Sequence, residues 1–209
     1  MELMEYLCTH FLNKTQLLSA AQVSDEELRN YQAFGLVPKC SYKLNLNLDC
    51  HSFFGEHLEH GTIEYFAKGY VEWLQHVHAA SDKKSVYRGF AVRYRHTLEN
   101  LNKLGFESTH PNVNELLDSH IEQEWQHFLN GTYGLCTQSG LPEDIAAKEL
   151  AILIINALTL GPVTSDLDKQ KLKQAVDLLD SVSAQFAPHE RERSSRNRLI
   201  DGVRAKYLV

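Results

Sequence analysis

The alternation of hydrophobic and polar residues separates a segment with strand character from a long helical segment. Residues 41–50, SYKLNLNLDC, alternate apolar and polar side chains, which is typical of a β-strand with one covered face. A glycine-bounded stretch, residues 51–61, links this strand to a second short one at residues 62–66. The two segments predict a small β-hairpin.

From Gly69 onward the apolar residues recur at spacings of three and four, which indicates amphipathic α-helices. Glycine and proline residues separate the segments and mark where one helix ends before the next. The predicted helices cover residues 69–80, 85–105, 112–131, 142–161 and 167–186, and a last helix starts in the tail from 188. The chain is therefore predicted to be mainly α with a small β-hairpin.

Short helices are also predicted before the first strand, at residues 2–12 and 15–21. Ser24 and Glu27 then have the spacing of a capping box, in which each side chain accepts a backbone hydrogen bond from the other residue. A third helix should begin there and stop at Gly35, the residue type that most often terminates a helix. Two helices joined by a tight turn form a helix-turn-helix.

Composition and charge are those of a folded protein of the cytoplasm. The 209 residues are 43% hydrophobic, which is enough for a sizeable core. The four cysteines are scattered without a CxxC pair, which favours free thiols. The acidic N-terminus does not resemble a signal peptide, and the longest apolar run, residues 150–161, is too short to cross a bilayer. We expect a cytoplasmic protein with no membrane partner.

The stretch LLSAAQVSDEELRNYQAFGLVP, residues 17–38, resembles the first two helices of MerR-like winged helix-turn-helix regulators. The resemblance implies that SYKLNLNL is the wing and that EYFAKGYVEWL, residues 64–74, contains the helix that follows it. It predicts a degenerate winged helix-turn-helix with a β-hairpin over residues 1–75, followed by an α-helical domain over residues 76–209.

The residues that should face DNA argue against DNA binding. Asp25, Glu26 and Glu27 occupy the start of the would-be recognition helix, where bases and phosphates are usually approached. Arg29 is the one basic residue in that helix, and the predicted wing offers Lys43 alone. The net charge of −6 also disfavours binding to phosphate backbones. We therefore expect DNA to be an unlikely partner.

Residues 50–70 concentrate histidine, glutamate and aromatic side chains. Carboxylates beside aromatic walls can acquire a pKa suited to proton transfer, and the aromatic rings can line a flat apolar substrate. The candidates for proton transfer are Glu64, Glu56 and His57, and those for substrate contact are Phe53, Phe54, Tyr65 and Tyr70. Two alternatives stay open: the aromatics fill the core beneath the wing, or Cys50, His51, His57 and His60 bind a metal, although their spacing matches no established zinc pattern.

Two further features have simpler explanations. Cys136 follows a glycine loop and is more readily explained as a buried cysteine than as a nucleophile, because no acid–base partner has a diagnostic spacing. The arginine-rich tail is explained by an exposed helix with ion pairs four residues apart, such as Glu192 with Arg196. The alternatives for the tail are an arginine that reaches a substrate carboxylate and an arginine at a dimer contact.

A second resemblance covers most of the chain. The combination of PKCSYKL, SFFGEH, EYFAKGYVEWL, NGTYGLC and ERSSRNRLI is similar to a small bacterial natural-product biosynthesis family. That family includes the β-carboline-forming Pictet–Spengler enzymes of the marinacarboline type. The resemblance implies a homodimeric, cofactor-independent cyclase, with no metal, that condenses a tryptophan-like amine with an aldehyde.

The same resemblance implies an acid–base glutamate, a histidine and an arginine in the active site. Glu64 or Glu56 would be the glutamate, and His57 the histidine. The segment has no arginine, so Lys43, Arg29 or an arginine of the tail would have to hold the substrate carboxylate. Two other functions stay open: a ligand-sensing MerR-like regulator, and a protein that uses the same scaffold to bind a partner without catalysis.

Overall fold

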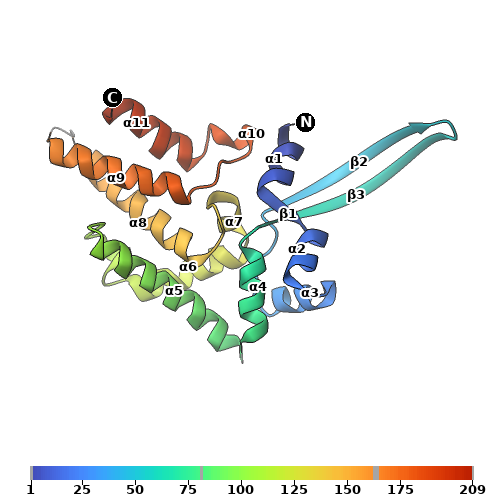
Figure 1. Ribbon diagram of the computed structural model, residues 1–209, viewed down its shortest axis with the longest axis horizontal. Coiled ribbons are helices and arrows are strands. Elements are labelled where there is room, and N and C mark those ends of the chain that lie inside the picture. The colour runs from blue at the N-terminus through green and yellow to red at the C-terminus, as the bar shows by residue number, and fades with distance from the viewer. Residues whose placement is uncertain (1, 81, 162–164, 209) are drawn as a thin grey trace.

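The computed structural model describes residues 2–80, 82–161 and 165–208. Its first part, which we call the N-terminal unit, mixes helices with a sheet (Figure 1). The elements of this unit are α1 (Glu2–His10), β1 (Phe11–Asn13), α2 (Lys14–Ala21), α3 (Asp25–Ala33), β2 (Tyr42–Ser52), β3 (Gly55–Ala67) and α4 (Tyr70–Ala79).

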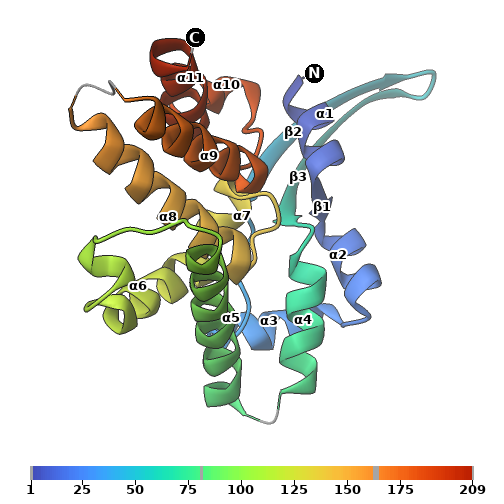
Figure 2. The same cartoon turned by 60° about the vertical axis from the view of Figure 1, so that its left-hand side comes forward.

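The rest of the chain is helical, and we call it the helical unit. In Figure 2, α8 runs between α5 and α9, and both of these helices contact it. The elements of this unit are α5 (Lys83–Lys103), the 3₁₀ turn η1 (Pro111–Val113), α6 (Leu117–Leu129), α7 (Thr132–Cys136), α8 (Pro142–Thr159), α9 (Asp166–Val182), α10 (Pro188–Arg191), the π turn η2 (Asn197–Asp201) and α11 (Gly202–Tyr207).

The prediction of a mainly helical chain with a small sheet is confirmed, but the sheet has a third strand. Its order is β1-β3-β2 and all pairs are antiparallel. The predicted first helix, residues 2–12, ends at His10, and Phe11–Asn13 instead pairs with the end of β3. No pattern in three residues distinguishes such a strand, because its pairing depends on β3, more than fifty residues later in the chain.

The link predicted at residues 51–61 is wrong, because these residues continue the two strands. The strands β2 and β3 stay in register from Tyr42 opposite Tyr65 to Ser52 opposite Gly55, and Phe53 and Phe54 form the turn. Residues 45–62 project away from the body of the protein (Figure 1), and we call this part the arm. The side chains of the arm therefore extend into solvent and do not cover a hydrophobic core.

The predicted start and end of the helix α3 are confirmed. Ser24 Oγ accepts a hydrogen bond from the Glu27 backbone N–H at 3.1 Å, and the Glu27 carboxylate accepts one from the Ser24 N–H at 2.7 Å. Gly35 adopts a φ of +64°, the left-handed conformation that terminates a helix most readily at glycine. The capping box fixes where α3 begins, and Gly35 where the chain turns away from it.

One hydrophobic core joins the two units. Phe66, Tyr70 and Trp73 of the N-terminal unit lie in the same buried cluster as Phe90 and Phe128 of the helical unit. The rings of Tyr70, Trp73, Phe90 and Phe128 meet edge to face or tilted, at centroid distances such as 4.9 Å between Trp73 and Phe128. The core therefore continues across the predicted boundary between residues 75 and 76, which falls inside α4.

The tail differs from its prediction. An exposed helix with a Glu192–Arg196 ion pair was expected, but residues 192–194 form a turn between α10 and η2. Arg196 is buried and donates to the Asp180 carboxylate at 2.6 Å and to the Ala184 carbonyl at 3.0 Å. The break in the helix lets the guanidinium turn inward, where it ties the tail to the end of α9.

No helix among the described residues is both long enough and apolar enough to span a membrane.

Candidate functional site

The arm carries Glu56 and His57, two of the three residues predicted for catalysis, and neither lines either of the two cavities described below. Glu56 lies opposite His51 and His57 opposite Cys50, all with exposed side chains. Phe53 and Phe54 at the tip are each 96% exposed and contact each other edge to face. Neither phenylalanine lines either of the two cavities described below.

The pleat of the arm argues against the alternative that Cys50, His51, His57 and His60 bind a metal. Residues directly opposite each other in an antiparallel pair point to the same face, and successive residues point to opposite faces. Cys50 and His57 therefore share one face, while His51 and His60 share the other. Among the described residues, no three His, Cys, Asp or Glu side chains are grouped so that they could hold a metal ion.

The remaining predicted residues are scattered over the N-terminal unit. Glu64 lies opposite Lys43 at the base of the arm, 3.9 Å from the Lys14 ammonium. Arg29 pairs with Asp25 on α3 at 2.6 Å. Two predicted substrate contacts are buried elsewhere: Tyr65 packs in a small cluster with α1, and Tyr70 lies in the main core. The structure does not gather the predicted set into one site within a single chain.

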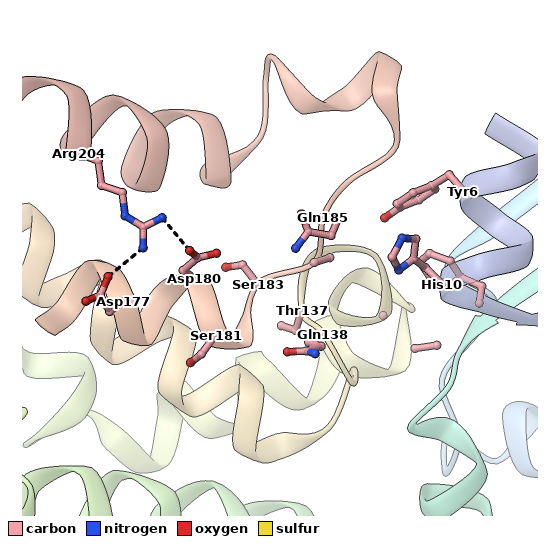
Figure 3. Close-up of a pocket in the computed structure, with 14 residues that line it drawn as sticks. Tyr6, His10, Thr137, Gln138, Asp177, Asp180, Ser181, Ser183, Gln185 and Arg204 are labelled. Carbon is pink, nitrogen blue, oxygen red and sulfur yellow. Dashed lines mark hydrogen bonds and ion pairs between the residues drawn. The ribbon is translucent and has the colours of Figure 1, made fainter. Parts of the chain in front are cut away.

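A different place in the structure gathers polar side chains around a cavity. This junction cavity, of about 500 Å³, lies between α1 and the sheet on one side and α7, α9 and α11 on the other (Figure 3). Its lining comes from segments that are far apart in the sequence: Tyr6, His10, Phe11, Ala67, Gly134, Thr137, Gln138, Asp177, Asp180, Ser181, Ser183, Ala184, Gln185 and Arg204.

One wall of the junction cavity is a network of charges. Arg204 of α11 donates to Asp177 at 2.8 Å and to Asp180 at 2.7 Å (Figure 3). Hydrogen bonds from Lys173 and Arg204 lower the pKa of the Asp177 carboxyl. Burial opposes ionisation of Asp180, but hydrogen bonds from Arg204 and Arg196 outweigh it and lower the pKa of that carboxyl as well. Both carboxylates are therefore ionised beside a permanent cation.

The floor of the junction cavity is made where the chain after α9 meets the loop after α7. The Gln138 N–H donates to the Val182 carbonyl at 2.8 Å, and Thr137 forms an isolated bridge with Ser183. Ser183 is 3% exposed as a residue, and its hydroxyl has no hydrogen-bond partner in the described structure. A buried hydroxyl without a partner costs free energy, which a bound molecule that bonds to it would recover.

The opposite wall is one face of α1. Tyr6 and His10 are four residues apart and therefore lie side by side, with ring centroids 4.8 Å apart (Figure 3). Burial raises the pKa of Tyr6, which keeps its hydroxyl protonated. An imidazole and a phenol thus face the charged wall across the cavity.

Buried ionisable residues also cluster inside the helical unit. Glu124 of α6 is 6% exposed and accepts a short hydrogen bond from the Tyr133 hydroxyl. The His120 imidazole lies 3.9 Å from Glu124 and 3.8 Å from Glu149 of α8. Burial raises the pKa of Glu124. These residues line neither cavity, so we treat the cluster as part of the interior.

A second cavity, of about 740 Å³, lies at the far ends of α5 and α8. Most of its lining from α8 is aliphatic, including Leu150, Leu153 and Ile154. It lacks the paired carboxylates, arginine and unpartnered hydroxyl of the junction cavity, which we therefore take as the candidate site.

Comparison with known families matches residues 86–208, the helical unit from α5 to α11, to a family described as "Family of unknown function (DUF6058)". The match covers more than half of the chain. The chain belongs to the DUF6058 family. Searches of curated proteins and of solved structures each gave no match.

The DUF6058 match includes one side of the junction cavity and not the other. The charged wall, Ser183 and the α7 loop fall inside it. Tyr6 and His10 on α1, together with the whole arm, fall outside it. The cavity is therefore built where the DUF6058 region meets the N-terminal unit.

Sequence reasoning missed most of this site, although the sequence contains weak signals of it. Asp177 and Asp180 are three residues apart within the predicted helix 167–186, and therefore on one face of it. Tyr6 and His10 have the corresponding spacing of four. Arg204 belongs to the arginine-rich tail, in which an arginine reaching a substrate was one alternative. No local pattern indicates that these three elements meet.

Proposed function

We propose that the protein is an enzyme that binds an amino-acid-like amine in the junction cavity and condenses it with an aldehyde. The observation that supports this is the charged wall, where Arg204 lies beside Asp177 and Asp180. An ammonium group is attracted by carboxylates, and a carboxylate accepts paired hydrogen bonds from a guanidinium. The resemblance to β-carboline-forming enzymes implies an arginine that holds the substrate carboxylate. Arg204 belongs to the arginine-rich tail, which was one of the expected sources of that arginine.

The reaction that we propose needs proton transfers and no cofactor. The free amine attacks the aldehyde carbon to give a carbinolamine, which loses water to form an iminium ion. The indole carbon then attacks the iminium carbon, and the proton on that indole carbon leaves to restore the ring. His10 faces the cavity and is the type of side chain best suited to exchange these protons near neutral pH.

Tyr6 and Asp180 have supporting roles in this proposal. Because burial raises the pKa of Tyr6, its hydroxyl stays protonated and can donate to the aldehyde oxygen. Asp180 stays ionised because two arginines donate to it, and a fixed carboxylate stabilises the positive charge of the iminium ion. Glu64, Glu56 and His57 stay the candidates implied by the resemblance, and they lie outside this cavity in one chain.

We also propose that the N-terminal unit is a winged helix-turn-helix scaffold that does not bind DNA. Its order of helix, strand, two helices and two strands, with β1 paired to β3, supports the scaffold. Within residues 1–75 the carboxylates outnumber lysine and arginine two to one. The first turn of α3 carries Asp25, Glu26 and Glu27, which a phosphate backbone would repel. A DNA-binding regulator is therefore the less supported function.

Binding of the amine is tested by calorimetry with three related compounds. Tryptophan has both charged groups, tryptamine lacks the carboxylate, and indole-3-propionate lacks the amine, so tryptophan should bind most tightly. Arg204→Gln should weaken tryptophan binding about tenfold and leave tryptamine binding nearly unchanged. Arg198→Gln, in the exposed part of the tail, is the matched control. If none of the three compounds binds, the proposal that the junction cavity binds an amino-acid-like amine is contradicted.

Catalysis is tested by incubating the protein with tryptophan and a panel of reactive aldehydes, with mass spectrometry and indole-ring fluorescence as readouts. We expect product above the uncatalysed background, with His10→Gln losing at least about a hundredfold in rate, the usual contribution of a general acid–base group. The rate of Glu64→Gln is measured in parallel, because Glu64 is the acid–base candidate implied by the resemblance. Loss in Glu64→Gln with full activity in His10→Gln would move the chemistry to the base of the arm. No product with any aldehyde would refute the proposed reaction.

A further inference from the structure

The outer edge of β2 has no neighbouring strand among the described residues. In the order β1-β3-β2, β2 is an edge strand, and it is 11 residues long, or about 36 Å at the usual rise per residue. Proteins commonly protect such edges with proline, bulges or covering segments, because the unpaired backbone groups bind any compatible strand. β2 has no proline, and it keeps an unbroken one-to-one register with β3 along its whole length.

One face of β2 is apolar and the other is polar. Leu44, Leu46, Leu48 and Cys50 lie on one face, while Lys43, Asn45, Asn47 and Asp49 lie on the other. Leu44 contacts the small cluster beside α1, but Leu48 is 49% exposed on the arm. A strand that pairs with this edge must therefore present leucines on the same face, or polar and apolar side chains would be mixed.

The sequence of β2 meets this requirement for a second copy of itself. Two identical antiparallel strands related by a two-fold axis through Leu46 place Leu44 of one opposite Leu48 of the other. The same register places Lys43 directly opposite Asp49, twice by symmetry, and Asn45 opposite Asn47. Opposite charges in directly facing positions stabilise a pair of strands.

Other registers lose this match. A shift of the two-fold axis by one residue, to Asn47, places Lys43 opposite His51 and Asn45 opposite Asp49. An axis through Asn45 places Lys43 opposite Asn47. An axis midway between two residues sets leucine against asparagine, which the alternation of faces disfavours. The axes through Asn45 and Asn47 still set leucine against leucine, but the axis through Leu46 is the one among these that also pairs Lys43 with Asp49.

We propose that two copies of the chain associate by antiparallel pairing of their β2 strands about Leu46. The pairing makes a continuous four-stranded ribbon from the β2 and β3 strands of two chains, with the Lys43–Asp49 ion pairs on its polar face. It places Phe53 and Phe54 of each tip beside the stretch just before β2 in the partner. This association rests on the edge strand and is independent of the chemistry in the junction cavity.

Charge reversal tests the pairing through the dimer dissociation constant, measured by sedimentation on the full chain. Lys43→Glu sets two carboxylates against each other at both positions, and Asp49→Lys does the same with two ammonium groups. Each single variant should weaken the dimer roughly tenfold, and the double variant should return within about threefold of the original value. Circular dichroism checks that these exposed changes leave the fold intact. Failure of the double variant to recover would overturn the ion pairing.

Single cysteines test the register. In a background with Cys8 and Cys50 changed to serine, Leu46→Cys places two thiols across the two-fold axis, within reach of a disulfide. Asn45→Cys and Asn47→Cys place each thiol about two residues from its copy, too far to bridge. We expect a rapid covalent dimer from Leu46→Cys and little from the other two. A bridge at 45 or 47 would overturn the register, and a protein that is monomeric at every concentration would overturn the association.

Discussion

Opposing effects set the pKa of Glu124, a buried side chain inside the helical unit. Glu124 is desolvated on α6, and the Tyr133 hydroxyl donates to it. Burial raises its pKa against the opposing effects of that hydrogen bond and of His120. A carboxyl whose pKa is higher in the folded state holds its proton more tightly there. The stability that this proton provides is complete below the unfolded pKa and is lost as the pH rises through the folded one.

Glu124→Gln should therefore change how stability depends on pH. Glutamine has nearly the same shape, still accepts from Tyr133 and cannot ionise. The free energy of unfolding of the variant should exceed that of the original protein by a margin that grows as the pH rises from about 5 to 8. Urea denaturation at a series of pH values measures this margin. Glu122→Gln, an exposed neighbour on α6, is the control, and parallel curves for all three proteins would contradict the assignment.

Residue-level predictions from sequence succeeded where the interaction is local. The Ser24–Glu27 capping box involves two residues three apart, so the sequence contains all that is needed to recognise it. Arg196 was assigned to an exposed pair with Glu192 on the same reasoning, and this was wrong. Its partner, Asp180, is on α9 and meets it through tertiary packing that no local spacing reveals.

At the scale of elements, the arm is separate from the core. Its side chains are exposed or half-buried from residue 45 to 62, and the arm is held together by the antiparallel pairing of β2 with β3. Sequence reasoning recognised residues 41–50 because leucine alternates with polar residues there. It missed residues 51–61 as strand because histidine and glutamate occupy both faces, which leaves no hydrophobic period to detect.

Shortening the arm should leave the fold intact. We expect replacement of residues 47–60 by Asn-Gly, which forms a tight hairpin turn between Leu46 and Gly61, to change the melting temperature by no more than about 3 °C. Leu28→Ala, by contrast, empties a fully buried position and should cost about 3 kcal/mol. Thermal unfolding followed by circular dichroism compares the two. A large loss of stability in the shortened protein would show that the arm supports the core.

At the scale of the whole molecule, the two units are joined at a close contact. A Cβ on Gly134 of α7 would collide with the Ser41 hydroxyl and would come within 2.7 Å of the Tyr70 hydroxyl. Tyr70 is itself fully buried in the shared core. The absence of a side chain at Gly134 thus lets the helical unit approach the N-terminal unit, and the junction cavity lies beside this contact.

Gly134→Ala should destabilise the protein by about 2 kcal/mol, because the new methyl group would meet the fully buried Tyr70 and would lie 3.1 Å from the Ala67 Cβ, neither of which can rotate away. Gly61→Ala is the matched control, since nothing lies within 4 Å of a Cβ at that position. Urea unfolding is monitored by the fluorescence of the two core tryptophans, Trp73 and Trp125. Equal stability of the two variants would contradict a tight junction.

The sequence predicted the helices and the hairpin better than the site. Most helices follow from repeating patterns within each segment, and their ends moved by a few residues, as α9 shows by ending at Val182 and not at residue 186. The junction cavity depends on α1 and the sheet meeting α7, α9 and α11, which come much later in the chain. No single residue of its lining stands out in the sequence, and the site exists because α1 faces α9 and α11 across the cavity.

The lining of the junction cavity reaches from Tyr6 to Arg204, almost the full length of the chain. During synthesis the wall on α1 emerges from the ribosome long before Arg204 does. A nascent chain can bury part of its core before then, but it cannot assemble this cavity. A chain cut short before α11 would therefore fold in part, and it would lack the charged wall that we propose binds the substrate.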